Sequence, residues 1–165
     1  MGHDSLLVPN TLTPEDVMDN EPNGLILGGG PDISRRGNCD SYLNRLELPI
    51  LGICLGHQAI ALNFGGDVGT GQKGGYANVD IDVLKPENIL AGMPQKFSVW
   101  ASHADEVNRA PEVFEVMASS DICEVEAMCH RERLLFGVQW HPEVSHTEHG
   151  QKLFENFLKI CTERV

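Results

Sequence analysis

Cys54 lies between two glycines, Gly52 and Gly56, where an apolar run gives way to an amphipathic stretch. Residues 48–51 predict a strand and residues 57–62 predict a helix, so the cysteine falls in the turn between them. Glycines on both sides let a chain bend sharply and push the side chain out, as in a nucleophile elbow. The partial positive charge of a helix N-terminus favours thiolate over thiol. An isolated cysteine is usually an inert buried residue, but the paired glycines predict a nucleophile here.

His141 and Glu143 can supply the base that such a cysteine needs. They follow a mostly apolar segment at residues 134–140, which predicts a strand, and Pro142 fixes the backbone between them. If the segment stays extended, Glu143 projects the same way as His141 and can hold the imidazole in one tautomer. Taken alone, the two residues are equally well explained as a strand-end histidine and a solvated charge. With Cys54, they predict a Cys-His-Glu triad.

Three consecutive glycines, Gly28, Gly29 and Gly30, directly follow another apolar run at residues 24–27. They leave backbone N–H groups unobstructed, as an oxyanion hole or another anion site requires. A glycine-rich turn is weak evidence by itself, because such turns commonly connect strands to helices. It gains weight from the cysteine and the histidine.

The elements that position these residues alternate as in an α/β protein. Residues 13–16 (Thr-Pro-Glu-Asp) predict a helix start, and the helix after Cys54 is expected to end near Gly65. Apolar and polar residues alternate over residues 78–83, which predicts a half-exposed strand at an antiparallel edge. Residues 147–161 have the apolar spacing of a helix.

Three motifs, in this order, resemble those of the class I (triad) glutamine amidotransferases. They are residues 28–31 (Gly-Gly-Gly-Pro), 52–58 (Gly-Ile-Cys-Leu-Gly-His-Gln) and 137–143 (Gly-Val-Gln-Trp-His-Pro-Glu). Within that class, residues 99–107 and 142–150 resemble the glutaminases of GMP synthases. The resemblance covers nearly the whole chain. It implies a three-layer, flavodoxin-like α/β fold with a mostly parallel central sheet and an antiparallel edge, in one amidotransferase domain over residues 1–165.

The resemblance also implies a role for each matching residue. Cys54 attacks the side-chain carboxamide of glutamine, His141 passes the proton to the leaving ammonia, and Glu143 orients His141. The backbone N–H groups of Gly30 and Leu55 form the oxyanion hole. The residues implied to bind the α-amino and α-carboxylate ends of glutamine are Gln58, Ser102, Ala104 and Asp105.

A partner subunit is implied as well. In the two-subunit GMP synthases, an ATP pyrophosphatase (synthetase) subunit uses the ammonia to aminate XMP to GMP, so a heterodimer is expected. ATP and Mg²⁺ belong to that partner, and no cofactor is expected in this chain. His141, His146 and His149 lie close in sequence to Glu148, but their spacing is not that of a zinc site, so no metal is expected.

The chain differs from the family at its start. The family's first β-α unit, which precedes the segment matching residues 1–10, is missing, and residues 5–8 are expected to form the family's second strand. Either this sequence is shortened or another chain fills the gap. Shortening is favoured, because a core strand contributes more than the roughly 5–15 kcal/mol by which a domain is stable.

Composition fits a cytoplasmic enzyme. The chain has 165 residues, 41% of them hydrophobic, and its odd number of cysteines, five, fits a reducing compartment. No apolar stretch approaches the ~20 residues that span a bilayer, and no signal segment begins the chain. The net charge of −12 argues against a nucleic-acid partner and fits either a basic protein partner or solubility alone.

Two other functions stay open. One is the glutaminase of an anthranilate or aminodeoxychorismate synthase, whose cysteine motif reads similarly. Residues 71–76 lack the His-Gly-Lys that such glutaminases usually carry there. The other is a catalytically silent binding subunit, which the missing first unit would permit.

Overall fold

The computed structural model describes residues 4–163, and for residues 72–77 it describes the backbone. Among the described residues, seven strands form one sheet in the order β1-β2-β7-β6-β5-β3-β4. The strands are β1 (Leu25–Leu27), β2 (Ile50–Ile53), β3 (Asp67–Val83), β4 (Lys96–Arg109), β5 (Phe114–Ser119), β6 (Ala127–His130) and β7 (Leu135–Val138). The α-helices are α1 (Pro14–Met18), α2 (Cys39–Arg45), α3 (Leu55–Asn63) and α4 (Gly150–Thr162).

The sheet is mixed, with a parallel part and an antiparallel part. Strands β1, β2 and β7 run parallel, with Gly52 opposite Leu27 on one side and Gly137 on the other. The remaining neighbours, from β7 through β6, β5 and β3 to β4, are antiparallel. The antiparallel edge is therefore confirmed, and among the described residues it is larger than the sequence interpretation assumed. One reason is that the expected strand at residues 5–8 adds nothing to the parallel part.

The prediction of a strand at residues 5–8 is wrong. These residues have no regular secondary structure, and Leu6 and Leu7 are 68% and 99% exposed. A short apolar run becomes a strand when it gains a hydrogen-bonded neighbour and a packed face. Here residues 7–10 instead line a groove beside β1.

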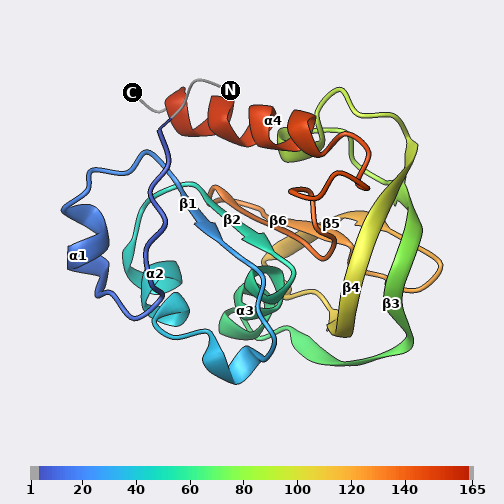
Figure 1. The fold of residues 1–165 in the computed structure, drawn as a ribbon, viewed down its shortest axis with the longest axis horizontal. Coiled ribbons are helices and arrows are strands. Elements are labelled where there is room, and N and C mark those ends of the chain that lie inside the picture. The colour runs from blue at the N-terminus through green and yellow to red at the C-terminus, as the bar shows by residue number, and fades with distance from the viewer. Residues whose placement is uncertain (1–3, 164–165) are drawn as a thin grey trace.

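Helices cover both faces of the sheet and make three layers (Figure 1). On one face, Leu153 and Phe157 of α4 pack with Ile81 and Val99 of the antiparallel strands. On the other, α1, α2 and α3 pack their apolar residues against β1 and β2 in a second buried cluster. The cluster includes Val17, Tyr42, Leu43, Ala59, Ile60, Leu27 and Ile50.

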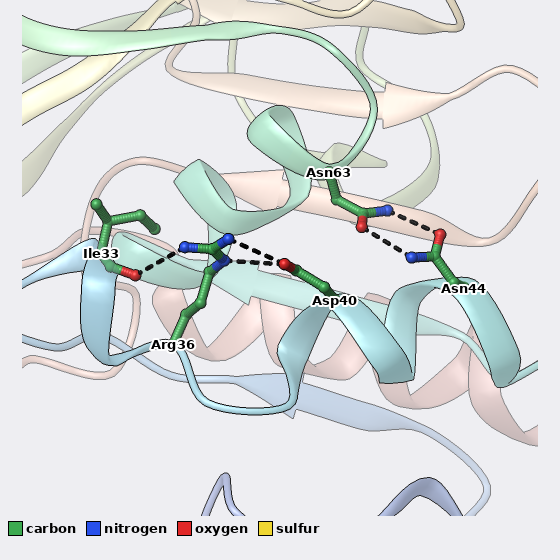
Figure 2. Close-up of polar contacts among 5 residues, drawn as sticks. All are labelled: Ile33, Arg36, Asp40, Asn44 and Asn63. Carbon is green, nitrogen blue, oxygen red and sulfur yellow. Dashed lines mark hydrogen bonds and ion pairs between the residues drawn. The ribbon is translucent and has the colours of Figure 1, made fainter.

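Polar contacts fix the segment that joins β1 to α3 (Figure 2). Arg36 donates from Nε and Nη2 to both carboxylate oxygens of Asp40, at 2.9 Å each, and from Nη1 to the backbone oxygen of Ile33 at 3.3 Å. Asn44 of α2 and Asn63 of α3 exchange amide hydrogen bonds at 3.0 and 3.1 Å. The helix that follows Cys54 is thus tied to its neighbour at its far end.

The predicted helix signals are confirmed. Thr13 caps α1 in a reciprocal capping box with Asp16, and α3 ends just before Gly65, whose φ is +83°. Ile81 and Val83 of β3 are buried while Asp80 is exposed, as alternation predicts. No helix within residues 4–163 is both long and apolar enough to cross a membrane.

Candidate active site

Cys54 sits in a sharp turn between β2 and α3. Its backbone has φ +52° and ψ −103°, a conformation that a non-glycine residue adopts only where the surroundings impose it. A Cβ on Gly52 would lie 2.5 Å from the backbone of Gly56, and one on Gly56 would lie 2.1 Å from the backbone oxygen of Leu27. Only glycine fits at either position, so the close approach of backbone segments explains the flanking glycines and confirms the predicted elbow.

The neighbouring strand and helix hold the cysteine in place. Its backbone N–H donates to Val138 O at 2.9 Å, and its carbonyl accepts from Gln58 N at 3.1 Å. Cys54 is 6% exposed and occupies the N-cap of α3, where helix N–H groups favour a negatively charged sulfur.

His141 contacts both Cys54 and Glu143. Its Nδ1 lies 2.7 Å from Glu143 Oε1. The hydrogen bond with Cys54, and then that with Glu143, raise the pKa of His141 to about 10. Partial burial raises the pKa of Glu143, but the hydrogen bond from His141, a backbone hydrogen bond and the charge on His141 together leave that pKa below its ordinary value. The structure thus brings the three predicted triad residues together.

The route to this contact differs from the one expected. Residues 142–143 lie in a turn rather than in an extended strand, so Glu143 reaches His141 by chain reversal. The backbone of His141 is held on both sides. Its N–H donates to Trp100 O at 3.1 Å, its carbonyl accepts from Thr147 Oγ1 at 2.6 Å, and that hydroxyl accepts from Trp100 N at 3.0 Å.

The turn at Gly28, Gly29 and Gly30 lies against the triad. A Cβ on Gly29 would be 3.1 Å from His141 Cε1 and 3.8 Å from Cys54 Cβ. A Cβ on Gly30 would be 3.1 Å from Leu55 Cδ1, so the two predicted oxyanion residues are neighbours. N–H groups on this turn and at the start of α3 are suited to a developing oxyanion.

The residues expected to bind substrate divide into two groups. Gln58 is 6% exposed, and its Nε2 donates to the backbone oxygen of Asp105 at 2.7 Å. The Asp105 carboxylate accepts from Thr70 Oγ1 at 3.2 Å. Ser102 and Ala104 lie on the same strand, β4, with exposed side chains. Among the described residues, no side-chain hydrogen bond links Ser102 or Ala104 to Cys54.

Two buried polar residues near the site were not assigned a role from the sequence. Gln139 is fully buried and donates from Nε2 to Cys54 Sγ at 3.8 Å. His103 is 5% exposed; burial lowers its pKa, and the charge on nearby His141 lowers it further. A glutamine inside the apolar run at residues 134–140 is a signal that the sequence did carry.

The side chains considered for a metal site lie apart from one another or pack on aromatic rings. Among them, no group of three His, Cys, Asp or Glu side chains is placed to hold a metal ion. The ring of His146 lies 5.4 Å from that of Trp100, and the ring of His149 lies 5.6 Å from that of Phe97. These two histidines pack on aromatic side chains.

Known proteins resemble this chain along nearly its whole length. The family model for glutamine amidotransferase class-I matches residues 1–161. The chain is 58% identical over 158 residues to a glutamine-hydrolyzing GMP synthase subunit of Methanosarcina barkeri, covering 96% of this chain and 84% of that protein. It is 53% identical over 160 residues to the protein of the same name from Methanococcoides burtonii, covering 97% and 85%.

A solved structure extends the likeness to three dimensions. The crystal structure of a protein assigned as a GMP synthase subunit, from Thermoplasma acidophilum, superposes with a TM-score of 0.90 at 37% identity. The match covers 95% of this chain and 80% of that one.

Proposed function

Because the chain belongs to the class I glutamine amidotransferase family, we propose that it is the glutamine-hydrolysing subunit of a GMP synthase. The observation that carries the chemistry is that Cys54, His141 and Glu143 meet beside Gly29: His141 Nδ1 lies 2.7 Å from Glu143 Oε1, and Gly29 lies against both Cys54 and His141. The names and high identity of the archaeal relatives support the choice of GMP synthase within the family.

In the proposed reaction, the Cys54 thiolate attacks the carboxamide carbon of glutamine. The carbonyl oxygen becomes an oxyanion that accepts hydrogen bonds from the N–H groups of Gly30 and Leu55. Protonated His141 donates to the departing nitrogen, ammonia leaves, and a thioester remains on Cys54. Water then attacks the thioester with His141 as the base, releasing glutamate. Glu143 holds the imidazole in orientation and stabilises its charged form.

Substrate orientation is proposed to depend on Gln58 and the segment of β4 that it contacts. Its hydrogen bond to the backbone of Asp105 fixes that segment relative to α3, whose first residues follow Cys54. Ser102, Ala104 and Asp105 are exposed on β4, where they are accessible to the α-amino and α-carboxylate groups of glutamine.

The ammonia is proposed to pass to an ATP pyrophosphatase subunit that binds ATP and Mg²⁺ and aminates XMP. The relatives are named as one subunit of a synthase, which supports a partner of this kind. The turn at residues 145–150 directly follows the triad glutamate and can transmit docking to it. With a net charge of −12, the chain is suited to a basic partner surface, and association should weaken as salt rises. The free, buried cysteines among residues 4–163 fit a cytoplasmic site of action.

Glutaminase assays with and without the synthetase, ATP and XMP test this function. We expect the isolated chain to be nearly inactive, because a displacement of about 1 Å in turns that carry oxyanion donors costs on the order of 100-fold in rate. Addition of the synthetase with ATP and XMP should activate hydrolysis. Activation by a chorismate-using synthase instead would assign the chain to the alternative glutaminase. No hydrolysis with either partner would favour a silent binding subunit.

A further inference from the structure

Gln139 is a fully buried amide whose side chain contacts the sulfur of Cys54. It directly follows β7, and its Nε2 donates to Cys54 Sγ at 3.8 Å. Moving an amide from water into a protein interior costs free energy unless other hydrogen bonds replace those made to water. A neutral thiol is a weak acceptor and is a poor replacement. The contact therefore indicates that the Cys54 sulfur is a thiolate when it attacks the substrate.

Two further contacts set the direction in which this amide points. Gln139 Oε1 accepts from Gln58 Nε2 at 3.5 Å, and the same Gln58 nitrogen donates to Asp105 O at 2.7 Å. The backbone N–H of Gln139 donates to Glu126 O at 2.8 Å, which joins the end of β7 to the segment before β6. Because the oxygen of the Gln139 amide faces a donor, its nitrogen is left to face the cysteine.

We propose that Gln139 is a further catalytic residue, whose amide N–H stabilises the thiolate of Cys54 and holds its sulfur in line with the substrate carbonyl. The inference rests on the proposed role of Cys54 as the nucleophile. Hydrogen bonds to an ionised acceptor are roughly twice as strong as neutral ones, so the amide favours thiolate over thiol. It differs from His141 in one respect. An amide does not titrate, so it supports the thiolate at every pH, whereas His141 does so only while protonated.

The arrangement also links the nucleophile to the substrate segment. A hydrogen-bonded path runs from Cys54 through Gln139 and Gln58 to the backbone of Asp105. A substrate that pulls on the Asp105 segment would act on Gln58, and through it on the amide that touches the sulfur. Gln139 thus ties the position of the sulfur to the segment proposed to bind the α-groups.

The pH dependence of Cys54 alkylation tests the inference without any turnover of glutamine. Iodoacetamide reacts with the thiolate, and mass spectrometry of the Cys54 peptide measures the rate at each pH. Gln139→Met keeps the approximate shape of the side chain but removes its N–H donor. We expect the midpoint of the alkylation rate against pH to rise by about one pH unit, so that below the midpoint about tenfold less Cys54 is present as thiolate. Gln139→Glu should raise it further, because its carboxylate faces the sulfur. With the synthetase present, kcat should fall more than KM changes.

A matched control is Asn156→Leu. Asn156 is a half-buried amide that donates to the backbone oxygens of Ile89 and Ala91. Its loss should lower thermal stability without moving the Cys54 midpoint. The buried Cys161, whose pKa burial raises to about 11, serves as an internal reference in the same spectra.

The outcomes separate this inference from the proposed function. A folded Gln139→Met protein with an unshifted midpoint would overturn the role of Gln139 alone. A wild-type Cys54 that reacts no faster than Cys161 would overturn the nucleophile assignment as well. A shift in both Gln139 variants, with none in Asn156→Leu, supports the inference.

Discussion

The Nδ1 atom of His141 lies 2.7 Å from Oε1 of Glu143, although the chain turns between them. His141 is still held in place, because its backbone N–H donates to Trp100 and its carbonyl accepts from Thr147. The base, the carboxylate and Thr147 therefore belong to one loop, and Trp100 ties that loop to β4.

Replacement of Cys54 by alanine should abolish glutamine hydrolysis, with a loss on the order of 10⁴-fold or more, because no other group can form the thioester. The fold should be retained, since the change removes one small side chain. Ammonia-dependent amination by the synthetase should survive as the control. Appreciable glutaminase activity in the Cys54→Ala protein would falsify the assignment of the nucleophile.

His141 should stay protonated through neutral pH, and NMR of its ring can follow the titration. Its pKa is raised from 6.5 to about 10, chiefly by Cys54, so Cys54→Ala should lower it more than Glu143→Gln does. Because the folded-state value is the raised one, the stabilisation from protonated His141 is fully present below pH 6.5 and disappears as the pH rises toward 10. An unchanged His141 titration in Cys54→Ala would contradict the hydrogen bond between them.

Gly29→Ala should impair catalysis while Gly28→Ala should not. A Cβ on Gly29 would crowd His141 Cε1 at 3.1 Å, whereas one on Gly28 would meet nothing within 4 Å. A displaced imidazole should cost on the order of 100-fold in kcat, with thermal stability little changed. Steady-state rates of the activated complex check both variants. Equal rates for Gly29→Ala and Gly28→Ala would mean that the turn does not position His141.

Thr147→Val should slow glutamine hydrolysis and destabilise the loop that carries His141. Thr147→Ser should have smaller effects on both. The Thr147 hydroxyl donates to His141 O and accepts from Trp100 N. Valine has the same shape but leaves both backbone groups unpaired, at a cost of about 1–3 kcal/mol. Thermal unfolding and kcat measured on both variants decide the matter. If serine and valine behave alike, the hydroxyl has no such function.

The parts of the site that depend on local geometry could be predicted from the sequence. Gly52 and Gly56 predicted the elbow around Cys54, because a glycine in regular structure usually marks a close backbone approach, and the structure has one at each position. Thr13 and Asp16 predicted their helix start for a similarly local reason.

The parts that depend on distant neighbours could not be predicted in the same way. Residues 5–8 have the composition of a strand, but a strand also needs a hydrogen-bonded neighbour and a packed face, neither of which a local pattern specifies. The contact between Gln139 and Cys54 joins residues 85 positions apart, and only the pairing of β2 with β7 brings them together. The turn that carries Glu143 to His141 was likewise set by contacts with β4 rather than by its own sequence.

The loop that carries His141 also covers the outer edge of the sheet. Strand β4 is last in the strand order, and the backbone groups of Ser98 and Trp100 are bound by that loop: Glu148 pairs with Ser98, while His141 and Thr147 bond to Trp100. A bare edge strand is a template for pairing with another chain and hence for aggregation. The loop that carries His141 thus also shields β4 from pairing with another chain, and a change that loosens this loop should increase aggregation as well as slow glutamine hydrolysis.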